Sequence, residues 1–288
     1  MCNKTKLHAY THYARAYIYL FSIRKESKKF TIAKSNENVM KNRTICVFLP
    51  LRLFIFIIIN NCVIINYTHG TLMKYVYLAI YLIFTTIHLY ASLKNNKELR
   101  NVTKVFILFT LLGFYLEAVD VLYWAVVCAI LFSLLGDLLL IPHGTKWFAA
   151  GGVAFMASHA FFIVSYIHYT DFSNVPIYVI IPFALAFMGA VIYIFYRLKQ
   201  FLPKALFYPM ALYLLINGAM NCFAIYRLFS NPTAGAIITV VGALLFFVSD
   251  TSLFFVRFNK NSVMKSHFLV MLTYSIGEFL IILGLILI

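Results

Sequence analysis

From residue 75 to its end, the chain is a succession of apolar runs, each close to the length that a helix needs to cross a bilayer. A helix of about 20 apolar residues spans the hydrocarbon core, which is about 30 Å thick. Breakers such as Pro142, Gly144, Pro203 and Pro232 separate the runs. The runs predict eight transmembrane helices, at residues 75–93, 102–116, 119–141, 147–169, 175–196, 205–227, 234–256 and 266–288.

Composition supports an all-α, polytopic membrane protein. The 288 residues are 63% hydrophobic and only 11% charged, with a mean hydropathy of +0.88. A soluble domain of this size cannot bury so much apolar surface. The net charge of +15 does not predict a nucleic-acid partner, because the Lys and Arg residues lie almost wholly in the N-terminal tail and the loops. The five cysteines form no CxxC pair and are expected to be free thiols.

Basic residues are distributed unevenly between the two sets of connections. The connections after the first, third, fifth and seventh predicted helices hold eleven Lys or Arg, against only Lys74 and Arg227 on the other side. The positive-inside rule therefore predicts that the first set is cytoplasmic and that the C-terminus faces away from it. The N-terminal apolar run has no signal-peptide features, so the default expectation is the endoplasmic reticulum or another intracellular membrane.

Residues 1–72 do not follow the pattern of the rest. They hold eleven Lys or Arg against two glutamates, and one apolar run at 45–66 that polar residues and a proline interrupt. Three interpretations stay open: a ninth hydrophobic segment that spans, an extension outside the fold with Met73 as the start of the core, or an amphipathic surface segment. We divide the chain into a basic N-terminal extension, 1–72, and an eight-helix transmembrane domain, 73–288.

Two acidic residues lie inside apolar runs near the same membrane boundary. Asp137 and Asp250 are expected roughly 6–10 Å below the cytoplasmic surface, at a rise of 1.5 Å per residue. A carboxylate in hydrocarbon costs roughly 3 kcal/mol or more, so such a residue usually has a function, with a structural hydrogen bond as the alternative. The steps Gly136-Asp137 and Ser249-Asp250 recur on helices four apart. This recurrence allows a 4+4 repeat with a site where its halves meet.

Other polar residues are spaced to share a cavity with these acids. His159 lies among small residues that let helices approach closely, so its helix is expected to be central; a packing role for this His is equally open. Tyr213, Asn217 and Asn221 repeat at four-residue spacing, as do Tyr274 and Glu278, which places each set on one helix face. Ser133 and Ser249 adjoin the acids. No HExxH, P-loop, GxGxxG or GxSxG motif occurs, so no metal or cofactor is predicted.

The chain resembles the YhhN-like lysoplasmalogenase family in four segments: SLLGDLLL (133–140), GGVAFMASHAFF (151–162), GALLFFVSDTSLFF (242–255) and YSIGEFLI (274–281). The resemblance runs from about residue 73 to the end, and the Gly-Asp and Ser-Asp steps on either side of His159 are its most specific part. Lys104 is similar to a family lysine that opens the second helix, although Val105 stands where proline is expected. Glu278 stands where glutamine is more usual.

The resemblance implies an eight-helix ether hydrolase of lipid metabolism that cleaves the vinyl ether bond of lysoplasmalogens. The products are a fatty aldehyde and glycerophosphoethanolamine or glycerophosphocholine. Such cleavage needs one protonated carboxyl, which donates to the outer alkene carbon, and one carboxylate that stabilises the oxocarbenium ion or activates water. Asp137 and Asp250 are the expected catalytic couple. The expected substrate-binding residues are His159, Tyr274, Glu278, Asn217, Ser133 and Ser249, with Lys104 at the head-group phosphate.

The expected partners are the lysophospholipid substrate and the bilayer, with a homodimer left open. Two other functions are considered. A zinc-dependent intramembrane lipid hydrolase would use Asp137 with three convergent histidines, but the last predicted helix has only His267, at its edge. A transporter or proton-coupled carrier would make equally natural use of intramembrane acids and a 4+4 repeat. A purely structural membrane protein would leave the acids unexplained.

Overall fold

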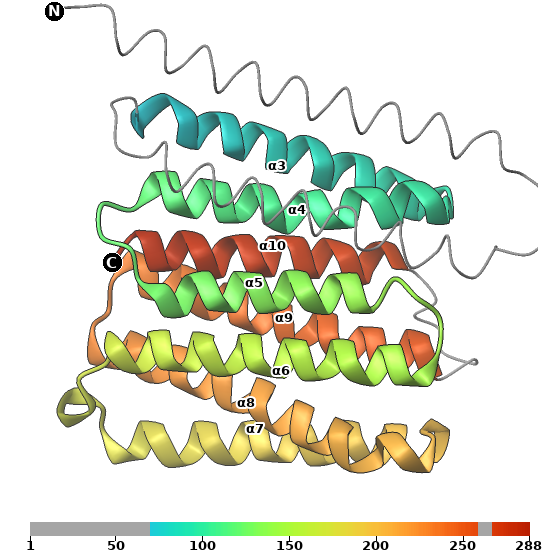
Figure 1. Ribbon diagram of the computed structural model, residues 1–288. Coiled ribbons are helices and arrows are strands. Elements are labelled where there is room, and N and C mark those ends of the chain that lie inside the picture. Colours follow the sequence, from blue (N-terminus) through green and yellow to red (C-terminus); the bar gives the residue numbers. More distant parts are fainter. Residues whose placement is uncertain (1–69, 259–266) are drawn as a thin grey trace, which may run out of the picture. The chain divides into compact units, whose positions relative to one another are not determined.

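The computed structural model describes residues 70–258 and 267–288, which all belong to one compact unit, Ile64–Ile288. In this part of the chain there are eight α-helices, α3 to α10, with three short 3-10 helices and no strand (Figure 1). The apolar segment at 45–66 lies outside the described residues, as does nearly all of the N-terminal extension, 1–72. The division into extension and core therefore stays a prediction.

Each of the eight predicted helices corresponds to one α-helix of the structure. The bounds are α3 (Gly70–Leu93), α4 (Lys97–Ala118), α5 (Trp124–Leu139), α6 (Thr145–His168), η1 (Phe172–Asn174), α7 (Ile177–Leu198), η2 (Lys199–Phe201), η3 (Lys204–Leu206), α8 (Phe207–Ser230), α9 (Ala234–Phe258) and α10 (His267–Ile286).

Seven of the described helices are long and apolar enough to cross a membrane. The remaining one, α5, has 16 residues. At a rise of 1.5 Å per residue this is roughly 24 Å, which is less than the thickness of a typical hydrocarbon core. The chain is an integral, multi-pass membrane protein. That α5 crosses as an eighth spanning helix stays a prediction.

The second and third helices differ most from their predicted bounds. α4 begins in polar sequence at Lys97, because the Asn96 side chain accepts a hydrogen bond from the Leu99 backbone N–H at 3.1 Å and caps the helix. α5 begins only at Trp124, because the chain is extended at Val119 and again at Tyr123. The sequence prediction placed the starts of both helices by hydropathy alone, and hydropathy contains no information on the Asn96 cap or on the extended connection.

The packing of the helices forms a closed ring. α4 packs on α5, α5 on α6, α6 on α8, α8 on α9, α9 on α10, and α10 returns to α4. α3 packs from outside against α4 and α10, and α7 packs from outside against α8 and α9. These two helices are the least buried of the spanning set. The interior is therefore built by α4, α5, α6, α8, α9 and α10.

The ring contacts repeat after four helices. The pairs α4–α5, α5–α6 and α10–α4 correspond to α8–α9, α9–α10 and α6–α8. This is the pattern expected for two four-helix halves, α3–α6 and α7–α10, related by an internal repeat. The repeat places α5 and α9, which carry Asp137 and Asp250, at equivalent positions.

α9 and α10 approach each other to backbone contact through glycines. A Cβ on Gly242 would lie 2.7 Å from the carbonyl oxygen of Gly277, and one on Gly277 would lie 2.9 Å from that of Gly242. Gly235 and Gly284 meet in the same way toward the other end of the pair. Small residues allow such close approach in membranes, where packing drives helix association. The contact sets the position of the acid on α9 relative to the polar residues of α10.

Candidate active site

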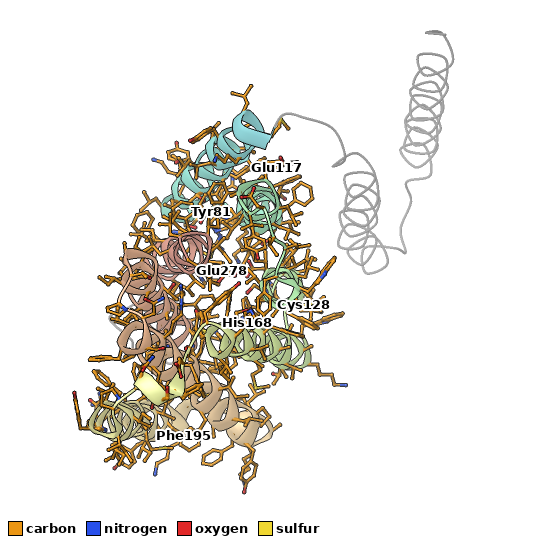
Figure 2. All side chains as sticks on the ribbon, turned by 90° about the vertical axis from the view of Figure 1, so that its left-hand side faces the viewer. Tyr81, Glu117, Cys128, His168, Phe195 and Glu278 are labelled. Atoms are coloured by element: carbon orange, nitrogen blue, oxygen red, sulfur yellow. The ribbon has the colours of Figure 1, made fainter. Side chains whose placement is uncertain are left out.

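Each helix of the ring contributes to one polar cluster in the interior. All of its side chains are buried except that of Lys104, which is 17% exposed. Figure 2, a view along the helices, shows Glu278 of α10 inside the bundle. The central polar cluster consists of Lys104 on α4, Ser133 and Asp137 on α5, Ser158 and His159 on α6, Tyr213 and Asn217 on α8, Asp250 on α9, and Tyr274 and Glu278 on α10.

Asp137 has a cation and a hydroxyl as partners. The Lys104 Nζ lies 3.0 Å from Oδ1, and the Tyr274 hydroxyl donates to Oδ2 at 3.0 Å. Each carboxylate oxygen therefore has one partner. A buried carboxylate is stable only when it is paired and hydrogen-bonded in this way. Lys104 and Tyr274 thus favour the ionised form of Asp137, while its burial disfavours that form.

Asp250 has a different set of partners. Its Oδ2 accepts hydrogen bonds from the Tyr213 hydroxyl and from Asn217 Nδ2, the latter at 2.7 Å. The Nε2 of His159 approaches the same oxygen at 3.4 Å, but without the alignment of a hydrogen bond. Within the described part of the chain, no side chain donates to Oδ1 and no Lys or Arg forms an ion pair with Asp250.

The two acids occupy equivalent places in the internal repeat. Asp137 on α5 is bound from α4 of its own half and from α10 of the other half. Asp250 on α9 is bound from α8 of its own half and approached from α6 of the other. The Phe246 ring contacts one residue near each acid: its centroid lies 5.0 Å from that of the His159 ring, beside Asp250, and 5.4 Å from that of the Tyr274 ring, beside Asp137.

The serines among the predicted residues differ in what they touch. Ser133 and Ser158 share a hydrogen bond of 2.8 Å between α5 and α6. Ser249 instead donates to the backbone oxygen of Val270 at 2.8 Å. The structure therefore brings Ser133 into the central polar cluster, whereas Ser249 joins α9 to α10.

Glu278 is fully buried beside the two acids. Asp137, Asp250 and Ser133 are its electrostatic neighbours. Among the described residues, neither of its carboxyl oxygens has an aligned hydrogen-bond partner, and no cation lies within ion-pair distance of it. Ser133 is thus the hydrogen-bonding neighbour of Glu278, although not in the alignment of a full hydrogen bond, and, unlike Asp137, Glu278 has no cation partner among the described residues.

Three residues that were not among the predicted site residues belong to the site: Ser158, Tyr213 and Arg100. Tyr213 was identified only as part of a polar stripe, yet it is a direct partner of Asp250; its four-residue spacing from Asn217 was the available signal. Arg100 lies one turn before Lys104 on α4, and its Nη1 is buried without a hydrogen-bond partner among the described residues. Basic residues also gather near the first turns of α4 and α10 and the last turn of α9. We call this group the basic rim; it consists of Lys97, Arg100, Lys104, Arg257 and His267.

The arrangement offers a paired carboxylate and a carboxyl with only neutral donors in one buried, largely apolar space. This combination suits acid–base chemistry, in which one group gives a proton and the other takes one. Across residues 70–258 and 267–288, no three His, Cys, Asp or Glu side chains are placed to hold a metal ion together.

Comparison with known proteins gives one match. The model of the YhhN family matches residues 99–285, which is more than half of the chain. Neither curated proteins nor solved structures give a match. The matched range begins in the first turn of α4, ends in the last turn of α10 and includes every member of the central polar cluster. On this match, which confirms the resemblance noted in the sequence, the chain belongs to the YhhN family.

Proposed function

We propose that the chain is a lysoplasmalogenase-type ether hydrolase. Its substrate is a lysoplasmalogen, and its products are a fatty aldehyde and glycerophosphoethanolamine or glycerophosphocholine. Membership of the YhhN family is consistent with this reaction. The observation that carries the proposal is the contrast between the acids: Asp137 has a cation partner, whereas Asp250 has only neutral donors, both on one oxygen.

Asp250 acts as the acid in this proposal. Tyr213 and Asn217 both donate to Oδ2, which leaves Oδ1 as the oxygen that carries the proton. That proton moves to the outer alkene carbon, whose π electrons form the new C–H bond. The inner carbon and the ether oxygen become an oxocarbenium ion, and Asp250 is left as a carboxylate. Proton transfer by a positioned acid is worth about 10²–10⁴-fold in rate.

Asp137 acts as the base. Held ionised by Lys104 and Tyr274, it stabilises the cation and takes a proton from the water that adds to the inner carbon. The hemiacetal that forms then breaks its bond to the glycerol oxygen. This oxygen receives the proton held by Asp137, and the hemiacetal hydroxyl returns a proton to Asp250. The aldehyde and glycerophosphoethanolamine or glycerophosphocholine leave, and both carboxyl groups regain their starting state.

The basic rim is the proposed site for the head-group phosphate. The sequence suggested Lys104 for this role, and its side chain is 17% exposed, but its ammonium is engaged by Asp137. Arg100 lies one turn nearer the helix start and has an unpartnered Nη1 among the described residues. Guanidinium groups bind phosphate with two parallel hydrogen bonds. We therefore assign the phosphate to Arg100, with Lys104 linking the head group to Asp137.

The test is aldehyde release by the purified full chain. A lysoplasmalogen and an ester lysophospholipid with the same head group are compared in the same detergent. Aldehyde is expected from the first, and no fatty acid from the second. Cleavage of the ester alone would show that the vinyl-ether assignment is wrong.

The roles of the two acids are tested by substitution. Asp137→Asn and Asp250→Asn are each expected to lower the rate of aldehyde release by about 10²–10⁴-fold, because each removes one proton-transfer group. Asp120→Asn, in the exposed connection between α4 and α5, is the matched control and is expected to keep the wild-type rate. Full activity in either cluster variant would remove that residue from the mechanism.

A proton-coupled carrier is the second candidate, favoured by the internal repeat of the ring. It would move substrate across a membrane without forming aldehyde. Reconstituted vesicles separate the two functions, because flux and aldehyde are measured in one sample. Flux without aldehyde would favour the carrier.

A further inference from the structure

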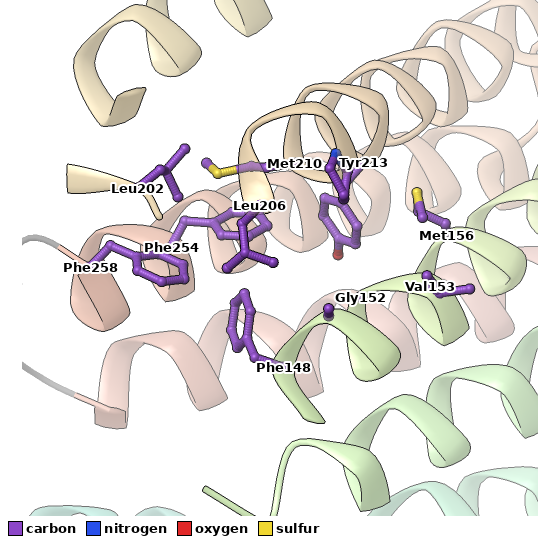
Figure 3. A pocket seen from close by; sticks show the side chains of 12 residues that line it. Phe148, Gly152, Val153, Met156, Leu202, Leu206, Met210, Tyr213, Phe254 and Phe258 are labelled. Carbon is purple, nitrogen blue, oxygen red and sulfur yellow. The ribbon is translucent and has the colours of Figure 1, made fainter. Parts of the chain in front are cut away.

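An apolar pocket lies beside the central polar cluster, between the first turns of α6 and α8 and the last turns of α9 (Figure 3). Its cavity volume is about 30 Å³, which is room for one or two water-sized groups, so it is a shallow groove that takes only part of a hydrocarbon chain. Its lining includes Gly152, Met156, Leu206, Met210 and Phe254.

The pocket has a closed inner wall and an open outer edge. Leu206, Met210 and Phe254 on the inner wall are at most 6% exposed, whereas Val153 at the edge is 57% exposed. The opening is therefore on the outer surface of the bundle, between α6 and α8. In a membrane-spanning chain this surface faces the hydrocarbon chains of lipids.

Tyr213 connects the pocket to the acid. It is the one residue of the lining that carries a hydroxyl, and Figure 3 shows its ring reaching into the space between the helices. The same hydroxyl donates to Oδ2 of Asp250. The Tyr213 side chain therefore lies between the pocket and Asp250, which is itself buried.

The equivalent helices α4 and α8 begin with side chains of opposite character. Met210 follows the first residue of α8, Phe207, by three positions, as Arg100 follows the first residue of α4, Lys97. The first turns of these equivalent helices thus present a hydrocarbon wall in one half and the basic rim in the other. An amphiphile with an anionic head and a hydrocarbon tail matches the basic rim and the apolar pocket at once.

We propose that this pocket is the subsite for part of the hydrocarbon chain of the substrate. The chain lies against α6, α8 and α9, and its vinyl ether end lies between Asp250 and Asp137. That the chain is an alkenyl chain rests on the proposed function; that the pocket binds a lipid chain rests on the pocket itself. Because a chain in the bilayer is already out of water, the pocket selects by shape and packing.

The first test fills the pocket. A Cβ on Gly152 would meet nothing within 4 Å, so Gly152→Leu introduces a side chain at the lining of the pocket from a position where its Cβ has room. Gly189 on α7 is exposed and also has nothing within 4 Å of a Cβ, so Gly189→Leu is the matched control. The measured quantity is the ratio of kcat/KM for a long-chain and a short-chain alkenyl substrate with the same head group.

Gly152→Leu is expected to lower this ratio about tenfold or more, because the short chain leaves room for the leucine and the long chain does not. Gly189→Leu is expected to keep the wild-type ratio. An unchanged ratio in Gly152→Leu, or an equal fall in both variants, would overturn the subsite.

The second test needs no turnover. A non-cleavable alkyl-ether lysophospholipid with a photoreactive diazirine in its chain is bound to the full chain in phospholipid vesicles and cross-linked. Adducts are expected near Met156 and Met210, and their loss is expected in Gly152→Leu. Labelling that the variant does not reduce, or that is spread evenly over the lipid-facing helices, would overturn the subsite. Labelling of the pocket in a protein that releases no aldehyde would support the subsite and refute the vinyl-ether reaction.

Discussion

Asp137 and Asp250 each follow a small residue in an apolar helix, yet their partners differ. Lys104 and Tyr274 bind the first, and Tyr213 and Asn217 bind the second. In a medium of low dielectric constant, one cation at 3.0 Å is a large difference between two otherwise similar sites. This difference is the physical basis for assigning the base to Asp137 and the acid to Asp250.

The ion pair predicts a stability effect. Lys104→Gln leaves the Asp137 carboxylate buried without a cation and is expected to lower the free energy of unfolding by about 3 kcal/mol, at the low end for buried pairs because Lys104 is partly exposed. The double variant Lys104→Gln, Asp137→Asn is expected to regain stability without regaining activity. Thermal unfolding in detergent measures the stability of both variants, and aldehyde release measures their activity. A single variant as stable as the wild type would show that the pair does not stabilise the fold.

The hydrogen bond from the Tyr213 hydroxyl to Asp250 predicts an effect on catalysis. Tyr213→Phe removes one of the two donors to Oδ2 and is expected to lower kcat about tenfold, the equivalent of one hydrogen bond to a reacting group. Tyr226→Phe is the matched control, since the Tyr226 hydroxyl donates to the backbone oxygen of Ile180 at 2.9 Å, away from the cluster. Equal rates in the two variants would contradict the assigned role of Tyr213.

At the scale of elements, the α9–α10 contact determines how the acid of one helix meets the polar face of the next. Backbone atoms lie where the side chains of larger residues would be. Neither backbone can give way as a flexible side chain would. The distance between these helices is therefore set by the glycines.

The close contact between α9 and α10 predicts that one methyl group added at Gly242 destabilises the fold. Gly242→Ala places a Cβ 2.7 Å from the Gly277 carbonyl oxygen and is expected to cost about 1–3 kcal/mol of stability. Activity is expected to fall as well, because Asp250 shifts relative to Tyr274. Gly189→Ala, in open space, is expected to leave the thermal midpoint and the rate unchanged. A wild-type midpoint in Gly242→Ala would mean that α9 and α10 separate at little cost.

At the scale of the whole molecule, the charge asymmetry predicts an orientation that labelling can test. Lys146 lies at the exposed start of α6, and Val121, in the connection between α4 and α5, is 84% exposed. A membrane-impermeant maleimide added from the cytoplasmic side is expected to label Lys146→Cys and not Val121→Cys. The unsubstituted chain, with its five cysteines, sets the background. Labelling of Val121→Cys alone would reverse the orientation.

The ring is the feature of the whole molecule that the sequence could suggest only in outline. The recurrence of a small residue before each Asp allowed a 4+4 repeat, and the helix contacts follow that repeat. Nothing in the sequence stated that α3 and α7 lie outside and that the other helices close around the acids. That follows from which helix surfaces fit together.

Much of the fold was predictable because hydropathy, charge and spacing are local properties of the chain. Runs of apolar residues predict an all-α, multi-pass membrane protein, and the segments around Asp137, His159 and Asp250 predict the family. Helix ends were less predictable. The start of α4 depends on the Asn96 cap, and α5 is shorter than its apolar run.

By itself, then, the sequence determined the class of protein, the approximate helices and the two buried acids, because each depends on residues near one another in the chain. Only the tertiary structure decided which groups meet. Tyr274 lies 137 positions from Asp137, and Tyr213 lies 37 from Asp250. Such contacts depend on helix packing across the whole ring. The different environments of the two acids, and the pocket beside one of them, are for that reason properties of the folded bundle.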